Sequence, residues 1–247
     1  MRFKVRIPHG IVERHIGLLL ILVIITLAVG GVIQIVPLFK IASTVEPIKG
    51  IRPYSPLELA GRNIYIKEGC VGCHSQMVRP LTDEKDRYGE YSRAAESMYD
   101  FPFLWGSKRT GPDLARVGGK YSNQWQYDHL VNPRQLVPQS VMPAYAHLAK
   151  NKLDYDDIAE HLKVMRRLGV PYTNEMINNA KADLMAQANG LANHDDLIYR
   201  YPKAVVVDTS DFIGDSEDNV VVTKMDAIVA YLQILGRMAE FDQEQQQ

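Results

Sequence analysis

The sequence predicts a mainly α-helical protein: a single N-terminal transmembrane helix, then a helical domain with additional helices and a small β-like insertion. The first observation behind this prediction is an uncharged apolar run at residues 16–33. The second is helical periodicity at residues 154–168 and 173–188. Valine-rich runs that favour strands are confined to residues 204–207 and 219–222, so β structure is expected only there.

The apolar run is 18 residues long, and 13 of these residues are Leu, Ile or Val. With its uncharged extension to about residue 36, it is long enough to cross a bilayer as a helix. A cleaved signal peptide and a buried core helix are the alternatives. The residues that follow, QIVPLFKIAST, contain no A-x-A cleavage pattern, so we expect a retained membrane anchor.

Basic residues before the apolar run set its predicted orientation. Arg2, Lys4, Arg6 and Arg14 precede it, whereas cations beyond it are sparser. By the positive-inside rule, we expect the N-terminus in the cytoplasm and the chain from about residue 40 onward on the periplasmic side.

The overall composition excludes several classes of protein. The chain has 28 basic and 29 acidic residues, and the basic residues form no stripe, so no nucleic acid is expected as a partner. Its two cysteines are too few for a multi-disulfide scaffold, and a four-thiolate zinc or iron–sulfur site cannot be built from this chain alone.

Two amphipathic helices are expected to bracket the second domain and to pack on each other. The first has Ser55 as its N-cap, Pro56 at its first position and Glu58 closing a capping box. The second begins after Thr223 and stops near Gly236. The side chains at helical spacing on the two helices are Leu57, Gly61, Ile64 and Tyr65, and Ile228, Tyr231, Leu232 and Leu235.

The stretch KEGCVGCHSQM holds both cysteines, Cys70 and Cys73, and His74 follows directly. This spacing suits two thioether bonds to the edge of one haem, with the histidine on its iron. The alternatives are a thioredoxin-like redox pair, half of a zinc site and a structural disulfide. The helical surroundings lack the βαβ context of thioredoxin, and the remaining histidines lack the spacing of a zinc finger. We therefore expect one covalently attached haem c.

A low-spin haem needs a second axial ligand on the opposite face of its iron. Met142 is the candidate, because Pro138 and Pro143 place it in irregular chain. His129 and His147 remain alternative ligands.

The second ring nitrogen of His74 needs a partner, and the carbonyl of Pro112 in the TGPDL turn is the candidate. Candidates for binding the haem propionates are Tyr121, Trp125, Arg134 and Tyr145. Leu114, Val117, Leu130, Leu136 and Val137 are expected either to line the haem or to form ordinary core.

The chain resembles the mono-haem cytochrome c subunit (subunit II) of cbb3-type cytochrome c oxidases. The resemblance rests on the N-terminal span and on GRNIYIKEGCVGCHSQMVRP, YGEYSRAAESMYDFPFLWGSKRTGPDLARVGGKYSNQWQYDHLVNPR, SVMPAYAHL, GVPYT and DAIVAYLQILG. It implies a class I-like cytochrome c domain in which Cys70 and Cys73 attach the haem and His74 and Met142 ligate its iron. Residues 190–222 are longer than in shorter family members and read as an insertion.

The resemblance also implies the function. The chain would be an electron-transfer subunit of cytochrome c oxidase, anchored in the bacterial inner membrane. It would receive single electrons from a di-haem cytochrome c subunit and relay them to the catalytic haem-copper subunit, with no oxygen chemistry of its own. Rival hypotheses are the cytochrome c subunit of a nitric oxide reductase, a free-standing membrane-tethered electron carrier and, from another class, a haem-based sensor.

The expected organisation is a cytoplasmic tail at 1–15, a transmembrane helix at 16–36, a linker at 37–54, a periplasmic mono-haem cytochrome c domain at 55–240 with an insertion at 190–222, and a tail at 241–247.

Overall fold

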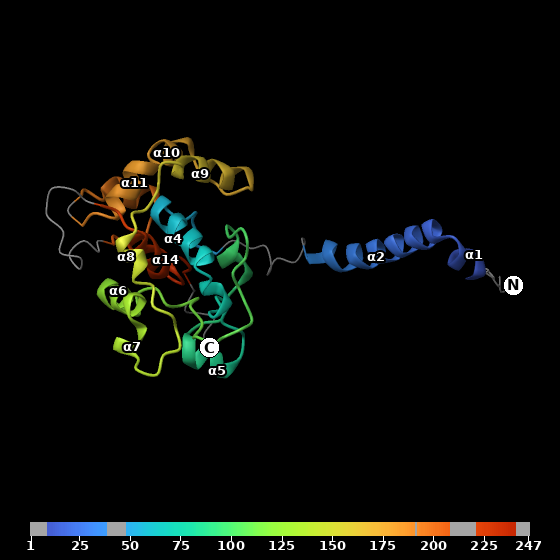
Figure 1. Ribbon diagram of the computed structural model, residues 1–247. Helices are drawn as coiled ribbons and strands as arrows, with labels where there is room; N and C mark the ends of the chain where they lie inside the picture. Colours follow the sequence, from blue (N-terminus) through green and yellow to red (C-terminus); the bar gives the residue numbers. More distant parts are fainter. Residues whose placement is uncertain (1–8, 39–47, 191, 208–220, 241–247) are drawn as a thin grey trace. The chain divides into compact units, whose positions relative to one another are not determined.

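The computed structural model describes residues 9–38, 48–190, 192–207 and 221–240 (Figure 1). These residues belong to two compact units, divided between Glu46 and Pro47. The tail at 241–247, residues 1–8 of the N-terminal tail, residues 39–47 of the predicted linker and residues 208–220 lie outside the described residues.

The first unit contains helices α1 (His9–Arg14) and α2 (Ile16–Leu38). Over Ile16–Pro37, α2 is long and apolar enough to cross a membrane. None of the side chains in that span is buried, which argues against a core helix. A helix of this length that is apolar all round suits a lipid environment.

The core of the second unit is built on two helices, α4 (Pro56–Lys67) and α14 (Lys224–Ile234), which pack against each other as predicted (Figure 1). The approach is close, because a Cβ atom on Gly61 would lie 1.8 Å from the carbonyl oxygen of Ala227. The rings of Tyr65 and Tyr231 are 5.5 Å apart at this contact. All the predicted stripe residues that carry side chains are buried: Leu57, Ile64, Tyr65, Ile228, Tyr231, Leu232 and Leu235.

The predicted starts of α4 and α14 are confirmed. The Ser55 hydroxyl accepts a hydrogen bond from the Glu58 amide, and the Glu58 carboxylate accepts one from the Ser55 amide at 2.8 Å. Thr223 and Asp226 form the same capping box at the start of α14. Gly236, just beyond α14, adopts a φ of +77°, which a glycine tolerates without strain.

Shorter helices surround this pair. They are η1 (Cys70–Gly72), α5 (Thr82–Tyr88), η2 (Ala94–Ser97), α6 (Asn123–Val131), α7 (Pro133–Leu136), α8 (His147–Lys150), α9 (Ile158–Arg167), α10 (Asn174–Asn178), α11 (Ala180–Gln187) and α12 (Asp195–Arg200).

The predicted helix at 173–188 is two helices, α10 and α11, joined at Asn179. The Asn179 side-chain amide donates a hydrogen bond to the Glu175 carbonyl at 3.0 Å, so this residue ends one helix locally. The helix expected at 154–168 begins only at Ile158, because the Asp154 carboxylate accepts a bond from the Asp156 amide and stabilises a turn there.

The mainly α class is confirmed, but the small β-like insertion is not found among the described residues. They contain no strand, and their single isolated bridge joins Lys152 to Thr223. Val207 is buried, and its amide bonds the carbonyl of Gln187 at the end of α11, 2.8 Å away. The valines at 204–207 therefore pack on the core without strand pairing, so the strand predicted there is wrong. Asn219 and Val220 lie outside the described residues.

Candidate haem-binding site

The two cysteines lie on one tight turn that directly follows α4. Gly69 adopts a φ of +76° and reverses the chain after the helix, and η1 then begins at Cys70. The carbonyl of Cys70 accepts hydrogen bonds from the amides of Cys73 and His74, at 3.1 and 3.0 Å. Local backbone hydrogen bonds thus bring Cys70, Cys73 and His74 onto one turn.

Both thiols are free; Cys70 is buried and Cys73 is exposed. Burial, reinforced by the nearby negative charge of Glu68, raises the pKa of the Cys70 thiol to about 12. A thioredoxin-like pair depends on a lowered thiol pKa, so this environment argues against that reading. Among the described residues, no cluster of three or more His, Cys, Asp or Glu side chains is arranged to hold a metal ion.

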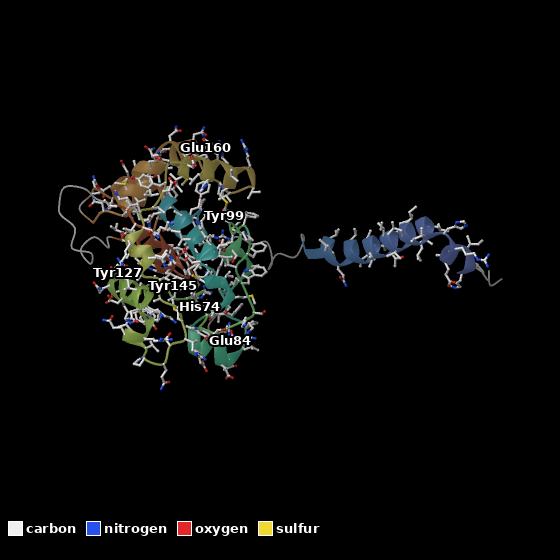
Figure 2. The ribbon with its side chains drawn as sticks, viewed as in Figure 1. His74, Glu84, Tyr99, Tyr127, Tyr145 and Glu160 are labelled. Carbon is white, nitrogen blue, oxygen red and sulfur yellow. The ribbon has the colours of Figure 1, made fainter. Side chains whose placement is uncertain are left out.

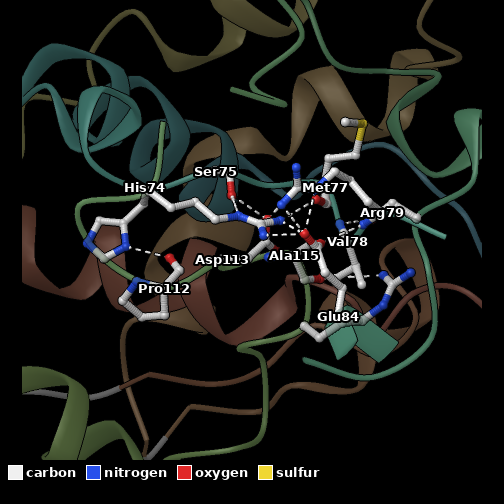
Figure 3. A network of polar contacts seen from close by, with 12 residues as sticks. His74, Ser75, Met77, Val78, Arg79, Glu84, Pro112, Asp113 and Ala115 are labelled. Atoms are coloured by element: carbon white, nitrogen blue, oxygen red, sulfur yellow. Dashed lines mark hydrogen bonds and ion pairs between the residues drawn. The ribbon is translucent and has the colours of Figure 1, made fainter. Parts of the chain in front are cut away.

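The His74 ring is clamped on one side. Its Nδ1 atom lies 2.8 Å from the carbonyl oxygen of Pro112, which is the contact expected from the sequence (Figure 3). Because that carbonyl can only accept, Nδ1 carries the proton and Nε2 keeps a lone pair available for a metal. A Cβ atom on Gly111 would lie 2.3 Å from the Cε1 atom of the ring, so only glycine fits beside this imidazole.

Charged residues that the sequence did not single out support the same turn (Figure 3). The Asp113 carboxylate accepts hydrogen bonds from the Ser75 hydroxyl and from the Met77 amide. Arg109 bonds both oxygens of Glu84, at 2.6 and 2.8 Å. The hydrogen bonds from Arg109 lower the pKa of the Glu84 carboxyl to about 2. The only sequence signal for this cluster is the position of Asp113 directly after Pro112.

Met142 lies in the irregular segment between α7 and α8, as predicted, and it is partly buried against the core. Its amide donates to the Ser140 hydroxyl at 3.2 Å, and Arg134 donates to the Ser140 carbonyl at 3.2 Å. Arg134 thus braces the segment that carries Met142, and it stays a candidate for contact with a haem propionate.

An aromatic stack runs along α6 and the turn before it. The Trp125 ring lies 3.8 Å from Tyr121 and 4.6 Å from His129, with nearly parallel planes. The Nδ1 atom of His129 is buried and has no hydrogen-bond partner among the described residues. Burial lowers the pKa of His129. This buried nitrogen, which has no partner among the described residues, keeps His129 a candidate ligand.

The segment that carries Tyr145 approaches the cysteine turn. Burial, and then charge at Cys70 and Cys73, raise the pKa of the Tyr145 hydroxyl, and Figure 2 shows Tyr145 in the same part of the domain as His74. The Nε2 atom of His147 lies 3.1 Å from the Glu68 carboxylate, so this alternative ligand already has a partner.

Apolar side chains near Met142 are left uncovered. Leu136, Val137 and Val141 are 36%, 44% and 74% exposed. Of the other residues considered as haem lining, Val117 and Leu130 are core, and Leu114 packs partly buried against it. Uncovered aliphatic surface, two free thiols and an imidazole with an available Nε2 are the features that a covalently bound porphyrin needs, so the residues present fit a haem.

Comparison with known families agrees with this chemistry. No curated protein matches the chain. Residues 9–239 match the family described as cytochrome c oxidase, mono-heme subunit/FixO. The match spans the apolar helix, the cysteine turn, Met142 and the closing helix α14. The chain therefore belongs to the family of mono-haem cytochrome c subunits of cbb3-type oxidases.

Proposed function

We propose that this chain is a membrane-anchored c-type cytochrome that relays single electrons to the catalytic subunit of a cbb3-type oxidase. Cys70 and Cys73 attach the haem through thioether bonds, and His74 and Met142 ligate its iron. The observation that carries the proposal is the His74 ring, held through Nδ1 by Pro112 on the turn that bears both cysteines, in a chain of the mono-haem subunit family.

The bound haem supplies a one-electron couple. The chain's own residues tune and hold that couple. The Pro112 carbonyl fixes the tautomer and the plane of the His74 imidazole, which presents Nε2. The thioether of Met142 raises the reduction potential relative to a second imidazole. Tyr121, Trp125, Arg134 and Tyr145 are the candidates for contact with the propionates.

The proposed path begins at a di-haem cytochrome c subunit and ends at the haem-copper subunit. Helix α2 spans the inner membrane with the N-terminus in the cytoplasm, and the domain at 55–240 faces the periplasm. The excess of basic residues before the span supports this orientation. This chain contributes electron transfer to the oxidase and no oxygen chemistry.

Attachment is tested by expressing the full chain in a bacterium able to mature c-type cytochromes. The denatured wild-type protein should carry the mass of one haem, and Cys73→Ala should lower or abolish the covalent adduct. Wild-type protein without the adduct would refute haem attachment.

The sixth ligand is tested with Met142→Ala, with His129→Ala as the rival variant and Met77→Ala as the matched control. We expect only Met142→Ala to abolish the charge-transfer absorption that a methionine–iron bond gives the ferric protein. Loss of the native ligation in His129→Ala alone would assign the sixth position to His129. Ready binding of carbon monoxide to the ferrous wild type would instead favour a sensor.

A further inference from the structure

We infer that Asp113, held in place by Arg109, is a positioning residue for the His74 imidazole. It ties the segment after His74 to the turn that carries Pro112, and so fixes the carbonyl acceptor opposite Nδ1. This inference rests on the proposed function, in which His74 ligates the haem iron.

One buried carboxylate joins the two segments. The Oδ2 atom of Asp113 accepts hydrogen bonds from the Ser75 hydroxyl at 2.6 Å and from the Met77 amide at 2.9 Å. Its Oδ1 atom accepts the Ala115 amide at 2.8 Å. The Asp113 side chain is completely buried, so water cannot replace any of these hydrogen bonds at its carboxylate.

The backbone on both sides of Pro112 is tied to the cysteine turn in the same way. The Gly111 amide donates to the carbonyl of Cys73, and the Leu114 amide donates to the carbonyl of Ser75, both at 2.9 Å. Asp113 lies between these two bonds. The position of the Pro112 carbonyl is therefore fixed by the same contacts that orient the chain leaving His74.

Arg109 holds the carboxylate and supplies the opposite charge. Its guanidinium donates to the Ser75 hydroxyl at 2.6 Å, to the Met77 carbonyl at 2.9 Å and to Asp113 at 3.3 Å. It also bonds both oxygens of Glu84 on α5. A buried carboxylate needs such a partner, and the fork geometry of arginine lets one side chain join all these groups.

The chemistry calls for a carboxylate at position 113. A hydroxyl, two backbone amides and a guanidinium all donate to it, and only an acceptor-only group satisfies them together. In an asparagine, the side-chain NH₂ group would replace one carboxylate oxygen and would face a group that is itself a hydrogen-bond donor. The turn would then shift, and the hydrogen bond from Nδ1 of His74 to Pro112 would weaken. A weaker bond lowers the basicity of the imidazole and favours reduced iron, so the reduction potential rises.

Two variants of opposite charge separate positioning from simple electrostatics. Asp113→Asn removes a negative charge, and Arg109→Gln removes a positive one, in full-length protein with its haem. Charge effects alone would raise the potential in the first variant and lower it in the second. Positioning predicts a rise in both, because both loosen the same turn. A fall or no change in Arg109→Gln overturns the inference.

A second measurement follows the imidazole itself. In ¹⁵N-histidine-labelled protein, the Nδ1 proton of His74 should exchange with solvent about tenfold faster in both variants, since a hydrogen bond near a charged group has about that net worth. Unchanged exchange overturns the inference. The matched control is the ion pair of Asp183 on α11 with Arg200 on α12; Asp183→Asn and Arg200→Gln should change neither the potential nor the exchange.

Ser75→Ala covers the case in which the charge variants do not fold. It removes one donor to Asp113 and leaves every charge paired, so we expect a smaller rise in potential; no change overturns the inference. Haem content of the wild type is measured first. A wild type without haem refutes the proposed function and this inference with it, whereas normal haem with opposite shifts refutes the inference alone.

Discussion

Replacing Gly111 with alanine should displace the His74 ring. The added Cβ would lie 2.3 Å from Cε1 and 2.8 Å from both ring nitrogens. Ordinary contact between such atoms is about 3.5 Å, so either the ring or the turn must move by roughly 1 Å. The hydrogen bond from Nδ1 to Pro112, now 2.8 Å long, cannot survive a displacement of that size with good geometry.

The loss of folding stability expected for Gly111→Ala has two parts. Overpacking of a tight site costs about 1–3 kcal/mol, and the lost hydrogen bond adds about 1 kcal/mol. Together they amount to about 2–4 kcal/mol, which corresponds to a fall in Tm of roughly 5–15 °C for a domain of about 200 residues. Calorimetry of the haem-loaded protein measures the fall, and a redox titration should show a raised potential.

Gly72→Ala is the matched control, because a Cβ atom there meets nothing within 4 Å. We expect its Tm to match that of the wild type. A Gly111→Ala protein whose Tm and potential both equal those of the wild type would show that the turn yields without cost, and would refute this reasoning.

Three further predictions concern helix packing, one ion pair and the axial ligand. Gly61→Ala should destabilise the domain by about 3 kcal/mol, the upper end of the usual cost of overpacking, in urea unfolding, because the new Cβ meets the backbone oxygen of Ala227 rather than a flexible side chain; wild-type stability would disprove the close approach. The pKa of Glu84 is lowered from 4.5 to about 2, so its pairing stabilises the folded state above pH 4.5 and is lost as the pH falls toward 2. Glu84→Gln should therefore lower the free energy of unfolding by at most about 3 kcal/mol at pH 7 and by progressively less below pH 4.5. A difference in stability between wild type and variant that stays the same in acid would contradict this. Met142→His should keep a low-spin haem with a lower potential, and an unchanged redox titration would remove Met142 from the axial position.

The features that the sequence predicted well are those set by neighbours in the chain. The capping boxes at Ser55 and Thr223 need only three following residues, and the cysteine turn spans five. The contact between His74 and Pro112 joins residues 38 positions apart. It could still be predicted, because an imidazole that binds a metal requires an acceptor for its second nitrogen, commonly a backbone carbonyl.

The features that escaped prediction depend on distant partners. Ser75, Glu84, Arg109 and Asp113 look like ordinary solvated residues in the sequence, and their mutual contacts cross 25 or more positions except for the pair from Arg109 to Asp113. At 204–207 the valines predicted a strand, because β propensity reports fit to a half-buried surface. Here these valines lie against the end of α11 instead of a neighbouring strand, and the Gln187 side-chain amide donates a hydrogen bond to the Val205 carbonyl.

The pairing of α4 with α14 bears on when the site becomes ordered. The cysteine turn begins directly after α4, yet the helix on which α4 rests is the last element of the described chain to be synthesised. A nascent chain that ends before residue 224 would already display both thiols, but Tyr65 would lack the ring of Tyr231 against which it packs. The cysteines are therefore available for modification before the rest of the domain can fix their place.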